Sequence, residues 1–263
     1  MNLINKIILS FKSQGTKKTL FKILSQITNI IFLKKYLRDK NTKNILKLKT
    51  PEERFSKIYQ SNYWIDNESR SGAGSNFEST KNIRFHLPIL IKKFNIESIF
   101  DAPCGDFNWI NYVLREVNVN YIGSDIVDEL IISNKKNFEN EKTKFSKLDI
   151  TKDRLPKSDL MICRDCLFHL SYADIFSFFK NFLSSEIKYI LVTSHLNKNY
   201  NFKNKDIISG DFRLLDIFSE PFNIQKEFIY EFDDRDSLEI KNFKQMYLFS
   251  AEKIKESLQR NNR

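Results

Sequence analysis

The sequence predicts an α/β fold: a seven-stranded, mostly parallel sheet with helices on both faces and a final antiparallel pair of strands. Three observations support this prediction. From residue 76 onward, short apolar runs alternate with longer amphipathic stretches. Near the C-terminus, the apolar runs at residues 222–232 and 243–250 are joined only by an acidic loop, as in a hairpin. The 263 residues, of which 41% are hydrophobic, suffice to bury a large core.

The expected elements follow in chain order. Helices are expected at residues 77–94, around 112–114, at 126–137 and at 173–183. Strands are expected at residues 98–102, 121–125, 145–150, 159–163 and 189–193, before the hairpin-like pair. This alternation is typical of a parallel sheet, because each helix carries the chain back to the start of the next strand.

The positive charge of the chain is concentrated near its N-terminus. The formal net charge is +10, and residues 1–50 alone contain twelve Lys or Arg and one acid, which gives them +11. Apolar residues recur at helical spacing over residues 3–11 and 20–36, and the polar stretch 38–44 should end this pattern. We expect a basic amphipathic helical arm that either lies on an anionic membrane or packs its apolar face on the body.

The rest of the chain carries a net charge of only −1 and divides into a body at residues 51–255 and a polar tail at residues 256–263. A nearly neutral body disfavours nucleic acid as a partner, because such surfaces are strongly basic. The three cysteines do not suggest a disulfide framework, and no apolar run approaches the ~18 residues of a membrane span. We expect a cytoplasmic protein, with contact at the inner face of the membrane left open; the sequence leaves the oligomeric state undefined.

The stretch IFDAPCGDFNW, residues 99–109, closes the first expected strand and indicates a nucleotide-type site. In open parallel sheets, ligands bind beyond the carboxyl ends of the strands. Gly105 permits close approach of the backbone, and Asp125, which closes the next strand, is placed to bind two ribose hydroxyls. Sites for NAD need several glycines around a pyrophosphate, whereas this loop has one glycine and the two carboxylates Asp101 and Asp106. Such charges favour a cationic ligand such as S-adenosylmethionine.

Four successive stretches, FDAPCGDFNW, YIGSDIV, KLDI and LPKSDLMICRDCLFHLS, resemble the motifs of class I S-adenosylmethionine-dependent methyltransferases, which have a Rossmann-like fold. With ERFSKIYQSNYW and SRSGAGSN upstream, residues 52–250 resemble a bacterial group associated with cell-surface polysaccharide and glycan biosynthesis. The first motif departs from the wider superfamily because only one of its glycines is present, a form that the narrower group shares.

The resemblance implies that residues 51–255 form a methyltransferase domain with S-adenosylmethionine as its cofactor. The implied cofactor-binding residues close the first three strands: Asp101, Ala102, Pro103 and Gly105 for the methionine portion, Asp125 for the ribose hydroxyls, and Asp149 with Ile150 for the adenine. The alternative for Asp149 is a turn residue at the end of a strand.

The stretch SRSGAGSN, residues 69–76, has two interpretations. It is either a lid that closes over the cofactor at Gly72, with Arg70 facing the carboxylate of methionine or an anionic substrate, or a linker before a helix that Ser75 or Asn76 caps. The aromatic residues Trp64 and Tyr63 either line the same site or anchor this segment in the core.

Methyl transfer to a hydroxyl group requires a base for the hydroxyl proton. We expect His169 to be this base, oriented by Asp165 four residues earlier on one face of a helical turn. The alternative is a structural His169, with His195 after the fifth strand as the competing base. His86 lies among apolar residues of a helix and is expected to be structural.

Two further groups of side chains need an interpretation. Cys163 and Cys166 have the spacing of a metal pair, but the chain has no second such pair, so no metal site is expected. Arg213 and Lys203 follow the fifth strand and either meet an anionic acceptor or lie in a solvated loop.

The predicted function is methyl transfer from S-adenosylmethionine to an acceptor, and the resemblance implies a sugar hydroxyl of a glycan or its precursor. A non-catalytic module that binds S-adenosylmethionine is the first alternative. A nucleic-acid methyltransferase is disfavoured by the charge of the body. A dehydrogenase is disfavoured most, since the loop lacks the phosphate-binding glycines.

Overall fold

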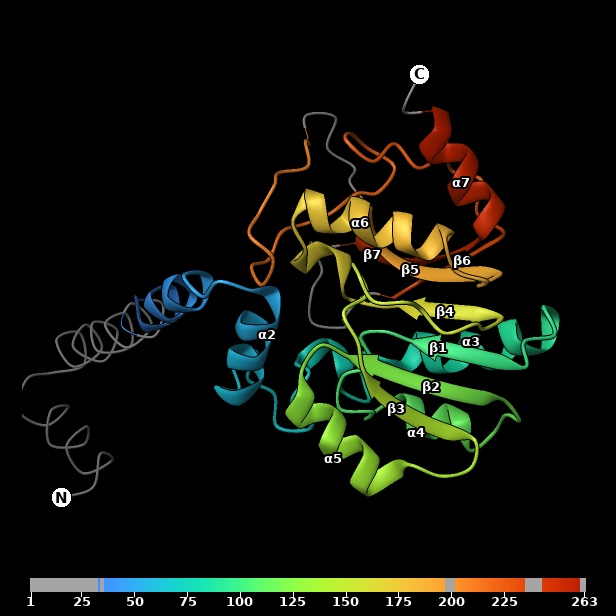
Figure 1. Ribbon diagram of the computed structural model, residues 1–263, viewed down its shortest axis with the longest axis horizontal. Helices are drawn as coiled ribbons and strands as arrows, with labels where there is room; N and C mark the ends of the chain where they lie inside the picture. Colours follow the sequence, from blue (N-terminus) through green and yellow to red (C-terminus); the bar gives the residue numbers. More distant parts are fainter. Residues whose placement is uncertain (1–32, 34–35, 197–201, 235–242, 261–263) are drawn as a thin grey trace, which may run out of the picture. The chain divides into compact units, whose positions relative to one another are not determined.

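The computed structural model describes residues 33, 36–196, 202–234 and 243–260 (Figure 1). The chain divides into two compact units, Met1–Lys47 and Leu48–Arg263. Within the described parts of the chain, no helix has the length and apolar character needed to cross a membrane.

In the first unit, residues 36–46 are helical. The polar stretch 38–44 therefore continues a helix, which corrects our expectation that it would end one. Inside this helix the Thr42 hydroxyl donates to the carbonyl of Arg38, so the side chain is satisfied without breaking the backbone ladder. The helices expected at residues 3–11 and over most of 20–36 lie outside the described residues.

The second unit is built around one seven-stranded sheet of order β3-β2-β1-β4-β5-β7-β6. Its strands are β1 (Ser98–Asp101), β2 (Asn120–Asp125), β3 (Thr143–Lys147), β4 (Leu160–Cys163), β5 (Tyr189–Leu196), β6 (Tyr230–Asp233) and β7 (Phe243–Ser250). The first five strands are parallel, and β7 runs antiparallel to both β5 and β6. The predicted fold is confirmed, and the strand order reverses between β1 and β4, where such sheets bind ligands.

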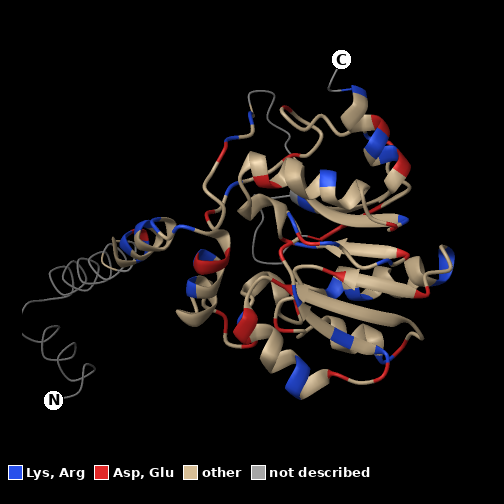
Figure 2. Ribbon diagram, in the orientation of Figure 1, with Lys and Arg blue, Asp and Glu red and all other residues tan. Residues whose placement is uncertain are grey.

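The helices of this unit are α2 (Pro51–Gln60), α3 (Lys81–Lys93), α4 (Ile110–Leu114), α5 (Asp128–Phe138), α6 (Tyr172–Leu183) and α7 (Ala251–Arg260), with short 3-10 turns η1 (Ala73–Ser75) and η2 (Leu167–His169). Helix α2 begins at Pro51 because Thr50 and Glu53 form a capping box before it. Figure 2 shows blue and red intermixed along these helices, with acids in the first turn of α5 and lysines in its last.

Two apolar cores cover the two faces of the sheet. Successive strand residues point to opposite faces, so Phe100 joins the core beneath α6 and α7 while Ile99 joins the core beneath α3, α4 and α5. The first core contains Phe178, Phe179 and Phe182 of α6, all fully buried. The sheet is therefore held from both sides, and its carboxyl edge is a fixed platform for the loops that follow the strands.

The C-terminal elements differ from the expectation in two ways. The strand expected at residues 222–232 is confined to β6, and most of the segment before it is irregular. Residues 256–260, expected to be a polar tail, continue α7, because Ile254 and Ser257 on its inner face are buried.

Candidate functional site

Asp101 closes β1 and is buried, with 2% of its surface exposed. Its Oδ2 accepts a hydrogen bond of 2.8 Å from the hydroxyl of Tyr121 on β2. Burial raises the pKa of Asp101 to about 7, because a carboxylate loses its hydration there. A cation next to Asp101 would favour the ionised form.

The loop after β1 is fastened to both neighbouring strands. The backbone N–H of Ala102 donates to Ile162 of β4 at 3.0 Å, and that of Cys104 donates to Ser124 of β2 at 2.8 Å. Pro103 lies between these two anchors. Gly105 follows with a φ of +56°, and a Cβ there would overlap Ser71 Oγ, so the loop requires glycine at this position.

Asp125 closes β2 and joins this loop to the start of α5. Its Oδ1 accepts from the backbone N–H of Val127 at 3.0 Å, and its Oδ2 accepts from that of Gly105 at 3.3 Å. Burial raises the pKa of Asp125 to about 6. A carboxylate offers about four acceptor sites, so Asp125 retains capacity to accept from a further hydroxyl donor.

Asp149 lies beyond the end of β3 and serves a turn. Its Oδ1 accepts from the backbone N–H of Thr151 at 3.0 Å and from the Thr151 hydroxyl at 2.6 Å, and its Oδ2 lies 3.1 Å from Lys152 Nζ. Burial opposes its ionisation, but these contacts outweigh burial and lower its pKa. These contacts match the alternative in which Asp149 is a turn residue. Ile150, the next residue, is buried in the core beneath α6.

The loop of residues 69–76 lies on the loop that follows β1. The carboxylate of Asp106 accepts from Ser69 Oγ at 3.0 Å, from the backbone N–H of Arg70 at 2.8 Å and from Ser71 Oγ at 3.2 Å. The sequence suggests that Asp106 adds a negative charge beside the ligand. In the structure, its carboxylate instead accepts from these three donors. It fastens the N-terminal end of the 69–76 loop.

The side chain of Arg70 is directed to α2. Its Nη2 donates to the carbonyl of Tyr59 at 3.0 Å, and the guanidinium stands 4.6 Å from the centre of the Tyr59 ring. The expected role of Arg70, opposite the methionine carboxylate or an anionic substrate, stays a prediction. Gly72, with a φ of +95°, packs so closely on Trp64 that an added Cβ would lie 2.9 Å from the Trp64 Cβ.

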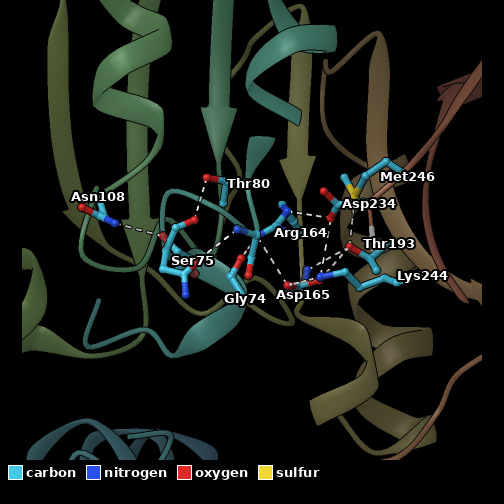
Figure 3. Close-up of polar contacts among 12 residues, drawn as sticks. Gly74, Ser75, Thr80, Asn108, Arg164, Asp165, Thr193, Asp234, Lys244 and Met246 are labelled. Carbon is cyan, nitrogen blue, oxygen red and sulfur yellow. Dashed lines mark hydrogen bonds and ion pairs between the residues drawn. The ribbon is translucent and has the colours of Figure 1, made fainter. Parts of the chain in front are cut away.

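The C-terminal end of the same loop meets the end of β4 (Figure 3). Arg164 Nη1 donates to the carbonyl of Gly74 at 2.7 Å, and a Cβ at Gly74 would lie 2.8 Å from Asp165 Oδ2. Arg164 Nε also pairs with Asp234 at 2.8 Å, and Lys244 Nζ lies 2.7 Å from Asp165 Oδ2 and 3.6 Å from Asp234. These charges form an ionic cluster of Arg164, Asp165, Asp234 and Lys244, in which all but the partly exposed Asp165 are buried.

Sequence reasoning missed half of this cluster. In the sequence, Asp234 belongs to the acidic loop between the last two apolar runs, and Lys244 lies within the second of these runs. Nothing local signals either residue, since each lies about 70 or 80 positions from its partner after β4. The pairing follows from the antiparallel placement of β7 against β5, which sets Lys244 opposite His195.

Asp165 does not orient His169, which corrects the sequence-based pairing. Its φ is +53°, and only residues 167–169 form a helical turn, so the two side chains do not share a helix face. Its backbone N–H donates to Thr193 Oγ1 at 2.9 Å. Burial opposes ionisation of Asp165, yet Arg164 and Lys244 lower its pKa to about 2. Such a carboxylate is a weak base.

His169 is oriented by a different group, the backbone carbonyl of Asp211, 2.8 Å from its Nδ1. A carbonyl only accepts, so Nδ1 carries the proton and Nε2 keeps a lone pair. Burial lowers the pKa of His169, so the neutral form prevails at neutral pH.

His195 has the opposite tautomer. Its Nδ1 accepts from the backbone N–H of Leu215 at 3.2 Å, so the proton of the neutral ring lies on Nε2. Burial lowers its pKa to about 4. His86 is remote from both, with Nδ1 2.9 Å from the Tyr230 hydroxyl and its ring stacked on Phe232 at 4.5 Å, as a structural histidine would be.

The remaining candidate residues from the sequence are two cysteines and two cationic residues. Cys163 is fully buried in the core, and Cys166 is nearly so. Among the residues that the structure describes, no three His, Cys, Asp or Glu side chains gather into a group that could hold a metal ion. Arg213 is buried and donates from Nη1 to the carbonyl of Leu170 at 2.6 Å, whereas Lys203 is exposed.

Solved structures share this fold. The magnesium protoporphyrin IX methyltransferase ChlM of Synechocystis PCC 6803 with bound S-adenosylmethionine matches with a TM-score of 0.53 and 10% identity, over 78% of this chain and 98% of that one. The same enzyme with bound S-adenosylhomocysteine gives 0.52 and 9%, over 76% and 99%. The CMeT domain of the citrinin polyketide synthase gives 0.51 and 13%, over 77% and 57%.

No protein-family model matches the sequence, and neither does any curated protein. The identities with the solved structures are low, so the likeness concerns the fold. The described residues of Leu48–Arg263 share a Rossmann-like fold with these solved methyltransferases, with the sheet order and antiparallel final pair described above.

Proposed function

We propose that the chain is an S-adenosylmethionine-dependent methyltransferase. The observation that carries the proposal is the pair of buried carboxylates, Asp101 and Asp125, at the carboxyl ends of adjacent parallel strands. Burial raises the pKa values of both, and Asp125 further raises the cost of ionising Asp101. A ligand with cationic groups relieves this cost, whereas the pyrophosphate of NAD would add to it.

The residues present fit the cofactor. Asp125 would accept the two ribose hydroxyls, and residues 101–105 would border the methionine portion, with Asp101 offering its carboxylate to the ammonium group. Ile150 would provide an apolar contact for the adenine. When bound, S-adenosylmethionine supplies a methyl group activated by a positively charged sulfur.

His169 is the proposed general base for an acceptor hydroxyl. Its Nε2 lone pair would take the proton that the acceptor oxygen loses, and the Asp211 carbonyl would hold the Nδ1 proton throughout. Asp165 is not the base, since its carboxylate is paired with Lys244 and Arg164. Its charge favours the imidazolium that forms on His169.

The acceptor is proposed to be a sugar hydroxyl of a cell-surface glycan or its precursor. The support is the resemblance of residues 52–250 to a bacterial group associated with glycan biosynthesis, marked most distinctly by SGAGS and DAPCGDFNW. In this proposal the protein is cytoplasmic, and the basic residues 1–50 hold it at the inner face of the membrane, near lipid-linked substrates.

Calorimetric titration tests the cofactor. S-adenosylhomocysteine should bind the wild type while NADH does not, and Asp125→Ala should weaken binding by about 2 kcal/mol, because a charge-assisted acceptor is lost. Asp128→Ala is the matched control, since Asp128 is an exposed acid nearby on α5. Equal binding of NADH, or no effect of Asp125→Ala, would contradict the proposal.

A second experiment tests the base. Transfer of labelled methyl groups to methyl glycosides should fall by about 10²-fold or more in His169→Gln, which cannot take up a proton. His195→Gln should retain more activity, since its Nε2 carries a proton in the wild type. A larger loss in His195→Gln than in His169→Gln would reverse the assignment.

A further inference from the structure

Aromatic rings surround His169 on several sides. The Trp64 ring lies 5.3 Å from it, the Phe168 ring 4.6 Å and the Phe212 ring 5.8 Å, measured between ring centres. Phe168 and Phe212 also lie 5.1 and 6.5 Å from His195. The proposed base is therefore set in an aromatic surface made by segments far apart in the sequence.

Part of this surface is open to solvent. Phe212 is 53% exposed, Ile208 in the same loop is 52% exposed, and Ile65, next to Trp64, is 77% exposed. Contiguous exposed apolar patches often mark binding sites. Trp64 and Phe212, from these two segments, both lie beside the His169 ring. Backbone hydrogen bonds hold the second segment against the η2 turn, from Gly210 to His169 and from Arg213 to Phe168.

The charges that act on His169 are mixed, with carboxylates in the majority. The ionised groups that act on His169 are the carboxylates Asp165 and Asp211 and one cation, Arg213. The Arg213 guanidinium is directed to the start of α6, where Nη1 binds Leu170 and the group stands 5.3 Å from the Tyr172 ring centre. Its other two nitrogens, Nε and Nη2, are buried and have no hydrogen-bond partner among the described residues.

We propose that Trp64 and Phe212 form the acceptor subsite and bind the apolar face of a neutral pyranose ring. This inference rests on the proposed methyltransferase function and names the class of acceptor. A pyranose presents C–H groups on its faces, which the electron-rich faces of aromatic rings attract, and hydroxyls at its rim. A ring bound beside His169 brings a rim hydroxyl to the lone pair of Nε2.

Trp64 also connects the proposed acceptor subsite to the loop that borders the proposed cofactor site. Trp64 contacts His169 with its ring and packs with its Cβ against Gly72 of the 69–76 loop. That loop is fastened to Asp106 beside the loop after β1. The position of the Trp64 ring therefore depends on the loop that borders the proposed cofactor site.

Saturation-transfer NMR tests the subsite on the full chain with S-adenosylhomocysteine present. The probes are methyl glucopyranoside, methyl mannopyranoside and the anionic methyl glucuronide. We expect the ring C–H protons of the neutral glycosides to receive saturation. Phe212→Ala should weaken their binding about fivefold or more, while Phe212→Tyr, which keeps a ring, should retain it. The control is Phe85→Ala, which removes a 66% exposed Phe on α3.

Several outcomes would overturn the subsite. One is equal glycoside binding by Phe212→Ala and wild type; another is binding of the glucuronide alone, lost in Arg213→Gln. If the wild type binds S-adenosylhomocysteine but none of the three glycosides, the subsite proposal fails and the proposed methyltransferase survives. If it does not bind S-adenosylhomocysteine, the proposed function itself fails.

Discussion

Burial prepares Asp101 and Asp125 to respond to a cationic ligand. Both carboxylates lie inside the protein, with pKa values of about 7 and about 6. A folded-state pKa above that of the unfolded chain means that ionisation opposes folding, so these two groups lower the stability of the ligand-free protein as pH rises from about 4 to about 7. A bound cation reverses part of this effect and releases protons.

The affinity for S-adenosylmethionine should therefore rise with pH. Below about pH 7, Asp101 holds a proton that must leave before its carboxylate can pair with the ammonium group. We expect Kd to fall by at most about tenfold per pH unit between roughly pH 5 and 7 and then to level off. Calorimetry across this range provides the measurement, and Asp101→Asn should flatten the profile. A wild-type Kd independent of pH would refute the role given to Asp101.

At the scale of single residues, the sequence predicted the positions that depend on strand ends and missed those that depend on local dihedral angles. Asp101 and Asp125 lie at the carboxyl ends of β1 and β2 as expected, because apolar runs define strands well. The pairing of Asp165 with His169 assumed a helical turn. The positive φ of Asp165 breaks that turn, and spacing alone does not reveal it.

At the scale of elements, the loop of residues 69–76 has two attachments of different kinds. Its first half is bound by one carboxylate, Asp106, and its second half by Arg164 of the ionic cluster. The loop borders the proposed cofactor site at one end and, through Gly72 and Trp64, the aromatic surface at the other. Loss of either attachment should therefore weaken the binding of both the cofactor and the acceptor.

Asp106→Ala tests the first attachment. Loss of the carboxylate leaves the donors of Ser69, Arg70 and Ser71 without their acceptor, so the loop should open more often. Hydrogen exchange of residues 69–75 should become about tenfold faster or more, and the affinity for S-adenosylhomocysteine should decrease. The exposed Glu116, which follows α4, provides the control variant, Glu116→Ala. Unchanged protection would show that Asp106 does not hold the loop.

The ionic cluster has a separate energetic consequence. Asp234 is fully buried, so Asp234→Leu leaves the two cations Arg164 and Lys244 with Asp165 as their shared carboxylate and should cost about 3 kcal/mol of unfolding free energy. The double variant Asp234→Leu with Arg164→Met should cost less than Asp234→Leu alone, because no charge is left unpaired. Urea unfolding of the wild type, both single variants and the double variant measures this coupling; strict additivity would argue against the pairing.

At the scale of the whole molecule, the order of elements was predictable and the long-range pairing was not. Alternating apolar and amphipathic segments predicted five parallel strands and an antiparallel end, because periodicity is a local property. The cluster of Arg164 with Asp234 joins residues 70 positions apart, and the aromatic surface joins Trp64 to Phe212. Such contacts arise only when the sheet assembles, so single segments carry no signal for them.

The division into two units leads to a prediction about the N-terminal arm. Every described site residue belongs to Leu48–Arg263, so a chain of residues 48–263 should bind S-adenosylhomocysteine as the full chain does. In contrast, only the full chain should float with vesicles containing phosphatidylglycerol, because the positive charge lies in residues 1–50. Vesicles of phosphatidylcholine alone are the control. Equal flotation of both proteins would remove the proposed membrane role.

The six glycines of the chain are unevenly used, and this limits how the protein could be re-engineered. Gly72, Gly74 and Gly105 all lie where the 69–76 loop meets its neighbours, and a single added methyl group at any of them would collide with Trp64, Asp165 or Ser71. Substitutions should therefore be tolerated least at these three glycines. Libraries that aim to broaden the range of acceptors should keep these three positions fixed and vary Phe212 and Ile208, whose exposed side chains can change size without disturbing the core.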